Sequence, residues 1–169
     1  MQHGQVVLVD TNIIIEAVRT GCWSALTAHF SVETVEKCCE EARTGQAHRP
    51  GYVTVDESAL RTRLAAHKVS GVMLFELGQR YPDADRLDAG ERHLWAHALG
   101  RNDEWLAACS DRAAVNAAVR LGWEDRLASL EELVNAAGAR SALKNLKEQF
   151  SASRLSAWRT AALLARGLK

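Results

Sequence analysis

The sequence of 169 residues predicts an α/β fold, a three-layer α/β/α sandwich around a central parallel sheet, followed by C-terminal helices. Short and fully apolar runs, such as residues 6–9, are typical of strands that are buried on both faces. These runs alternate along the chain with amphipathic stretches that are long enough for helices, which is the pattern of a parallel sheet covered by helices on both sides.

Each predicted strand is a short apolar run bounded by polar or turn-forming residues. The predicted strands are residues 6–9, 30–32, 105–109 and 127–128. Residues 53–55 form a short extended piece, and residues 72–75 form either a strand or the start of a helix, because their length does not decide between the two. Residues 44–51, which end in Pro50 and Gly51, are the strongest turn signal in the chain.

The predicted helices begin at polar capping residues and end near glycine. They span residues 12–19, 33–42, 56–67, 88–99, 111–121, a segment that begins at Ser129, 140–150 and 153–166. Gly21 and Gly122 follow two of them, and Ser129 with Glu132 has the spacing of a capping box.

Composition and charge exclude several classes of protein. The chain has 21 basic and 21 acidic residues, so its net charge produces no overall attraction to nucleic acid or membrane. No apolar run approaches the roughly 18 residues of a membrane span, and Asp10 and Glu16 interrupt the N-terminal segment, which excludes a signal peptide. The four cysteines include no C-x-x-C pair, as expected for core thiols in a reducing compartment. We therefore expect a cytoplasmic protein without membrane association.

Two acidic residues directly follow predicted strands. Asp10 ends the first apolar run and Asp111 follows the run at residues 105–109, and each precedes a helix. In open α/β sheets, ligand and catalytic groups gather at the carboxyl ends of the strands. A carboxylate at this position binds a metal, acts as a base or nucleophile, or only caps the helix that follows it.

Two further acids fall on the inward sides of predicted helices. Counted along a helix that starts at Glu33, Glu36 lies beside Val35 on the apolar stripe, where a carboxylate must be paired or must bind a cation. Glu91 lies at the N-terminal end of the buried face of the next predicted helix. The alternatives are an ion pair of Glu36 with an arginine or lysine and a capping box of Glu91 with Asp88.

The four acids are more informative together than singly. If their strands are neighbours, their carboxylates face one cleft and repel one another. A hard divalent cation removes that repulsion, and oxygen ligands without His or Cys indicate Mg²⁺ or Mn²⁺ rather than zinc. Such a metal activates a water and stabilises charge on a phosphate, so the site would hydrolyse phosphodiesters. The predicted catalytic and metal-binding residues are Asp10, Glu36, Glu91 and Asp111.

The segments around these acids resemble the PIN-domain nucleases, the family that includes the toxins of many bacterial toxin–antitoxin pairs. The order and approximate spacing of the segments follow the family from residue 5 to about residue 138, which we take as the nuclease domain, 1–138. The matching segments are residues 7–12, 32–36, 87–91, 110–114 and 121–122.

The resemblance implies a Mg²⁺- or Mn²⁺-dependent endoribonuclease that cleaves single-stranded RNA. It assigns the acidic roles to the four acids above, and the small polar roles that position substrate or water to Thr11, Asn12 and Ser110. Arg112 either meets the scissile phosphate or is an ordinary exposed arginine. Membership among the toxins would add an antitoxin protein as partner and allow a homodimer. The chain departs from the family in having one acid, Asp111, where a second acid often lies close by.

Residues 139–169 form a basic helical extension outside the family pattern. The extension has seven basic residues and one acid, which leaves a net charge of −6 on the first 138 residues. Arg140, Lys144 and Lys147 are spaced as one face of an α-helix, which either grips RNA phosphates or is simply solvated.

Two alternative functions remain on the same fold. One is a catalytically degenerate module that binds RNA or protein. The other is a phosphoacceptor domain, which is disfavoured because residues 127–129 lack the lysine that would meet the phosphoryl group.

Overall fold

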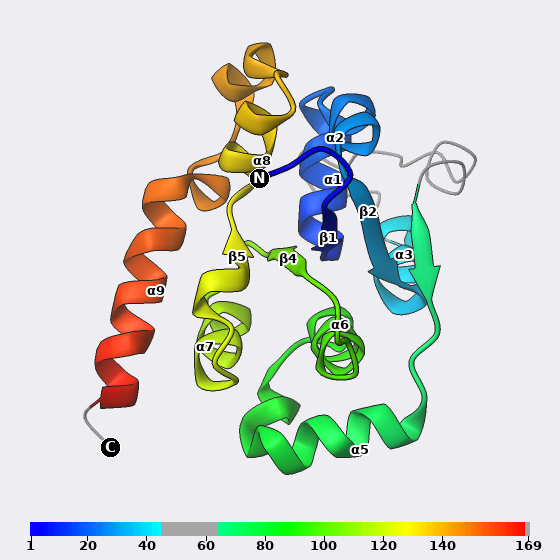
Figure 1. Ribbon diagram of the computed structural model, residues 1–169, viewed down its shortest axis with the longest axis vertical. Coiled ribbons are helices and arrows are strands. Elements are labelled where there is room, and N and C mark those ends of the chain that lie inside the picture. Colours follow the sequence, from blue (N-terminus) through cyan, green and yellow to red (C-terminus); the bar gives the residue numbers. More distant parts are fainter. Residues whose placement is uncertain (45–63, 168–169) are drawn as a thin grey trace.

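The structure is a computed structural model that describes residues 1–44 and 64–167. Its centre is a five-stranded parallel sheet with the strand order β3-β2-β1-β4-β5 (Figure 1). The strands are β1 (Val6–Val9), β2 (Ser31–Val35), β3 (Ala65–His67), β4 (Trp105–Ala108) and β5 (Leu127–Ala128). All four strand pairs are parallel. The predicted α/β architecture is therefore confirmed.

Helices cover both faces of the sheet. They are α1 (Thr11–Arg19), α2 (Trp23–His29), α3 (Glu36–Thr44), α5 (Gly71–Arg80), α6 (Ala89–Leu99), α7 (Arg112–Arg120), α8 (Leu130–Ala136) and α9 (Ala152–Gly167). Short 3₁₀ helices are η1 (Pro82–Arg86), η2 (Glu124–Arg126), η3 (Arg140–Asn145) and η4 (Glu148–Phe150). In the described part of the chain, no helix combines the length and apolarity that crossing a membrane requires.

The sheet separates two hydrophobic cores because side chains alternate along each strand. Val7 and Val9 of β1 join the core that contains residues of α1, α2 and α8. Leu8, between them, joins the core that contains residues of α5, α6 and α7. This alternation makes the sheet the middle layer of three, and Figure 1 shows α5 and α6 on one side of it and α1 and α2 on the other.

Several local predictions about the first half of the chain are corrected. The second strand continues to Val35, so α3 begins at Glu36 and not at Glu33. Residues 72–75 belong to α5, one of the two alternatives. Residues 65–67, predicted as the end of a helix, form β3 because they pair with Glu33–Val35 of β2. Residues 53–55, and most of the segments predicted at 44–51 and 56–67, lie outside the described residues. Helix α2 was not predicted.

The C-terminal extension packs on both cores. Residues 140–150 are two separate 3₁₀ segments and not one α-helix, so the predicted basic α-helical face is wrong. Phe150 is buried in the core of α1 and Leu155 in the core of α7. Figure 1 shows α9 alongside α7 on the outside of the molecule, and the two helices are in contact.

Three helices have terminal residues that the sequence identifies, two at the N-terminal end and one after the C-terminal end. Asp10 accepts a hydrogen bond from the Ile13 amide at the start of α1, at 2.7 Å. Ser129 and Glu132 form the predicted capping box of α8. Gly122, at φ +79°, follows α7 in the left-handed conformation that favours glycine.

Candidate functional site

The strand order places Asp10 at the point where the chain reverses its direction across the sheet. From β1 the chain moves outward to β2 and β3, and it then returns to place β4 on the other side of β1. Ligands in open α/β sheets bind beyond the carboxyl ends of the strands at such a point. The Asp10 amide donates to the Ala108 carbonyl at 3.4 Å, so the end of β1 lies against the end of β4.

Asp10 is a buried carboxylate without a cationic partner among the described residues. The residue is 2% exposed. One oxygen accepts from the Ile13 amide, and the other accepts from the Ser110 amide at 3.4 Å. Burial raises the pKa of Asp10 to about 7, against the lowering effect of these two hydrogen bonds, and the nearby charges of Asp88 and Asp111 raise it further. The residue is a helix cap, but the cap leaves its charge uncompensated.

Glu91 is buried close to the same acids. It is 4% exposed, and its Oε1 atom has no hydrogen-bond partner in the described part of the chain. Burial raises the pKa of Glu91 to about 8, and Asp88, Asp111 and Asp10 add to this shift. Asp88 accepts from the Glu91 amide at 2.7 Å, and a backbone hydrogen bond from Asp88 in turn lowers the pKa of Glu91, against the larger raising effects. The capping interaction with Asp88 therefore leaves Oε1 of Glu91 without a hydrogen-bond partner among the described residues.

Two exposed acids complete this group. Asp111 caps α7 by accepting from the Ala113 amide at 2.6 Å, and Asp88 caps α6. Both raise the pKa of the buried pair, so each exposed acid lies within electrostatic reach of Asp10 and of Glu91. Sequence reasoning treated Asp88 only as a cap. Its position three residues before Glu91 is the signal in the sequence that Asp88 also belongs to this group of acids.

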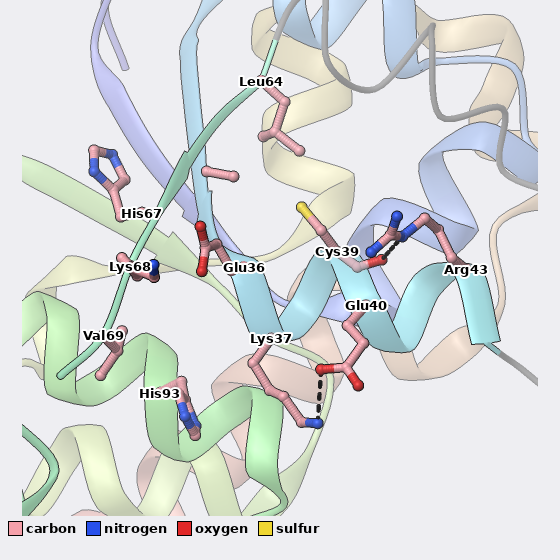
Figure 2. A pocket seen from close by; sticks show the side chains of 11 residues that line it. Glu36, Lys37, Cys39, Glu40, Arg43, Leu64, His67, Lys68, Val69 and His93 are labelled. Carbon is pink, nitrogen blue, oxygen red and sulfur yellow. Dashed lines mark hydrogen bonds and ion pairs between the residues drawn. The ribbon is translucent and has the colours of Figure 1, made fainter. Parts of the chain in front are cut away.

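The prediction that Glu36 lies on the buried face of α3 is wrong. Glu36 is exposed and lines a hollow beside β3 together with His67, Lys68 and His93 (Figure 2). The physical reason is the strand end at Val35. Residues before that point alternate with a period of two, so a helical stripe counted from within the strand has the wrong phase. No hydrogen bond or ion pair joins Glu36 to the four acids in the described residues.

Helix α3 instead brings Glu41 towards the site. The Thr11 hydroxyl, next to Asp10, donates to Glu41 Oε2 at 2.8 Å. Glu41 also approaches Gly90 of α6, where an added Cβ atom would lie 2.4 Å from Oε2. Cys38, which is fully buried, lies one helical turn earlier. When the helical period is counted from Glu36, Glu41 lies one turn after Cys38, and this spacing is the signal in the sequence that points to Glu41.

The predicted small polar residues have different surroundings. Ser110 is 7% exposed, and its hydroxyl oxygen has no partner in the described structure. Thr11 is half-buried and bonded to Glu41, whereas Asn12 and Arg112 are exposed. The Ser110 hydroxyl is therefore the predicted small polar group that is both buried and available.

The three basic residues that the sequence singles out in the extension do not contact the four acids of the candidate site in the described structure. The Lys147 amide donates to Glu16 Oε1 at 3.0 Å, near the C-terminal end of α1, whereas Asp10 caps the N-terminal end. Arg140 and Lys144 are exposed on η3. None of the three contacts the acids among the residues that the structure describes.

The donor set fits a hard divalent cation that keeps part of its water shell. It offers carboxylate and hydroxyl oxygens and a local excess of negative charge, and no arginine or lysine within the described ranges 1–44 and 64–167 pairs with it. No three of these acids place ligand atoms within 4.8 Å of one another, a spacing that only Glu33, His67 and His97 reach among the described residues. Mg²⁺ is commonly held by one or two carboxylates and several waters, so wider spacing suits it.

The cluster of Glu33, His67 and His97 already contains a cation from the protein. Arg101 Nη1 donates to Glu33 Oε2 at 2.6 Å and meets His97 Nε2 at 3.0 Å. The two imidazole rings are stacked, with centroids 4.3 Å apart. This group is an ion-pair network at the sheet edge, because its carboxylate is neutralised by the guanidinium.

Two comparisons with known proteins found no match, so the assignment of a function rests on the residues described above. No protein-family model matches the sequence, and no curated protein matches it.

Proposed function

We propose that the chain is a Mg²⁺- or Mn²⁺-dependent endoribonuclease of the PIN type that hydrolyses phosphodiester bonds in single-stranded RNA. The observation that carries the proposal is the pair of buried carboxylates, Asp10 and Glu91, without a cationic partner in the described structure. The choice of RNA as substrate rests on the sequence resemblance.

Electrostatics favour a catalytic over a structural explanation for this pair. Two buried acids with raised pKa values destabilise the folded chain in their ionised form. A structural acid in the same protein is handled differently: Glu16, 1% exposed, accepts two hydrogen bonds from Arg19. A group of acids that lacks a cationic partner among the described residues, at the ligand-binding end of the sheet, is typical of a functional site.

The roles of the residues follow from their positions. When bound, Mg²⁺ or Mn²⁺ supplies Lewis-acid stabilisation of the phosphate and a water of lowered pKa. Asp10 and Glu91 provide buried carboxylates to hold the cation, and Asp111 and Asp88 add negative charge at the open edge. The Ser110 hydroxyl orients a water or a phosphate oxygen. The Thr11–Glu41 bond fixes the residue beside Asp10.

Metal-dependent cleavage of a defined, unstructured RNA tests the proposal. The assay compares the wild type with Asp10→Asn, in excess Mg²⁺ or Mn²⁺ and in EDTA. We expect cleavage by the wild type only with metal, and a loss of about a hundredfold or more in Asp10→Asn, with an unchanged circular dichroism spectrum. Asp125→Asn, which removes an exposed acid on η2, is the matched control and should cleave like the wild type.

Two results would contradict the proposal. One is Asp10→Asn with wild-type cleavage. The other is a wild type that neither binds a divalent cation by calorimetry nor cuts RNA, which would favour the degenerate binding module.

A further inference from the structure

A cleft of about 220 Å³ lies between η1, α7 and α9, apart from the hollow beside β3. Its charged lining consists of three arginines, Arg86, Arg112 and Arg120, and one acid, Asp83. Three positive charges and one negative charge leave an excess of two positive charges on a protein body that is otherwise acidic. An arginine-lined cleft of this kind suits a phosphate, because the guanidinium group bonds to phosphate oxygens in a forked geometry.

The cleft begins beside the acids of the candidate site. Arg112 is the residue after Asp111, and it is the first residue of α7. Arg112, Asn116 and Arg120 are spaced by four residues, so they follow one face of the helix. At a rise of 1.5 Å per residue, this face extends about 12 Å away from the acids. A strand that crosses the acids can therefore continue along α7.

Several hydrogen-bond donors in the cleft are held in place or left unused. Arg120 and Arg86 both contact Asp83, at 3.1 and 3.4 Å, which keeps these two guanidinium groups together. Within the described structure, Arg112 and Asn116 form no side-chain hydrogen bond. Burial and the charge of Asp83 raise the pKa of Tyr81 above its usual value, so its hydroxyl remains a donor.

The C-terminal extension supplies the opposite wall. Ala161, Ala162 and Ala165 of α9 line the cleft. Their small side chains leave room for a ligand over α7. These residues lie outside the segment that resembles the nuclease family, so the cleft depends on this chain's own extension.

We infer that this cleft binds a backbone phosphate of a single-stranded RNA whose neighbouring phosphodiester lies at the acids around Asp10. The inference rests on the proposed function for the identity of the ligand. It gives Arg112, Arg120 and Asn116 a role in binding the strand. It also explains why an extension with alanines on one face packs against α7.

Fluorescence polarisation with a labelled single-stranded RNA decamer, in EDTA and over a range of KCl concentrations, tests the cleft without cleavage. Loss of one phosphate contact lowers the slope of log K against log salt by about 0.7, which is about fourfold in affinity near 0.15 M salt. We expect this loss in Arg112→Gln and in Arg120→Gln. Asp83→Asn, which removes the acid, should bind more tightly. The matched control is Arg80→Gln, an exposed arginine at the end of α5, which should stay close to the wild type.

The outcomes separate the cleft from the nuclease proposal. Cleft variants that bind like Arg80→Gln, or a wild type that binds no RNA, would overturn the cleft. Equal affinity for inorganic phosphate and for the decamer would also overturn it, because it would indicate a small-anion site. If the wild type cleaves RNA and the cleft variants bind RNA like the wild type, the nuclease proposal is supported and the cleft proposal is overturned. If the wild type binds RNA without cleaving it and the cleft variants lose this binding, the cleft proposal is supported and the nuclease proposal is overturned.

Discussion

Thr11 and Glu41 are joined by a hydrogen bond of 2.8 Å between the threonine hydroxyl and the glutamate Oε2 atom. The bond connects the first residue of α1 to the second turn of α3, thirty residues later in the chain. Because Asp10 directly precedes Thr11, the bond brings a fifth carboxylate to the edge of the acid group. It also identifies which acid of α3 belongs with the candidate site.

Substitutions of Glu41 and of Glu36 should have different effects on RNA cleavage. Glu41→Gln should lower metal-dependent RNA cleavage by about ten- to a hundredfold, the usual effect of losing a residue that orients metal ligands. Glu36→Gln should stay within about twofold of the wild type because Glu36 is exposed away from the acids. The measurement is the initial cleavage rate at saturating Mg²⁺. The reverse order of the two variants would restore the role that the sequence assigned to Glu36.

Gly90→Ala tests the packing of Glu41 directly. An alanine Cβ atom would lie 2.4 Å from Glu41 Oε2 and 3.2 Å from Cys38 Sγ. Because Oε2 is at the end of a flexible side chain, the carboxylate should move away and the fold should persist, aided by the higher helix propensity of alanine, worth about 1 kcal/mol. We expect reduced cleavage with a change in unfolding free energy below about 1.5 kcal/mol. Gly100→Ala, at the end of the same helix, is the control, since its nearest neighbour is 3.9 Å away. Full activity in Gly90→Ala would contradict a role for Glu41.

Glu91 and Glu16 are both buried, but within the described residues Glu16 has cationic partners and Glu91 has none. Glu16 is held by Arg19 and by the Lys147 amide, and these bonds lower its pKa despite the opposing effect of burial. Glu16→Gln should therefore lower the unfolding free energy by about 1–3 kcal/mol, as for a charged hydrogen bond, without changing the rate per folded molecule. Glu91→Gln should leave metal-free stability unchanged or higher, and should abolish cleavage. Urea unfolding and cleavage rates of both variants measure this contrast, and a large destabilisation by Glu91→Gln would indicate a structural role.

Stability of the metal-free protein should depend on pH through Asp10 and Glu91. Their folded pKa values, about 7 and about 8, lie above the ordinary values of 3.8 and 4.5. The stability that these protons contribute is therefore fully present below about pH 4 and is lost as the pH rises through the folded values. Urea unfolding should show a decline of up to about 1.4 kcal/mol per pH unit for each group.

The double variant Asp10→Asn, Glu91→Gln provides the control for that decline. Its stability should fall less than that of the wild type over the same pH range, because the two titrating groups are gone. Mg²⁺ affinity of the wild type should rise with pH, since binding releases protons. Parallel stability profiles for the two proteins would mean that these carboxyls do not carry the pH dependence.

Periodicity in the sequence was sufficient for the layers of the fold and for part of the candidate site. Residues 6–9 and 105–109 were recognisable as buried strands because their apolar character does not depend on distant neighbours. The acids that follow them, Asp10 and Asp111, could be placed at strand ends for the same reason. The edge strand β3 could not be found, since its three residues become a strand only through pairing with β2.

The sequence by itself determined the alternation of strands and helices and the two acids at strand ends, because local apolar runs and helix caps are written into neighbouring residues. Only the tertiary structure decided that Glu41 and not Glu36 approaches Asp10, that Glu91 has no cationic partner in the described part of the chain, and that α9 completes an arginine-lined cleft. These depend on where β2 stops, on which helix packs beside which, and on whether a buried charge meets a partner from a distant segment. Each of these three features is determined by contacts between residues far apart in the chain, and such contacts cannot be predicted from a local sequence pattern.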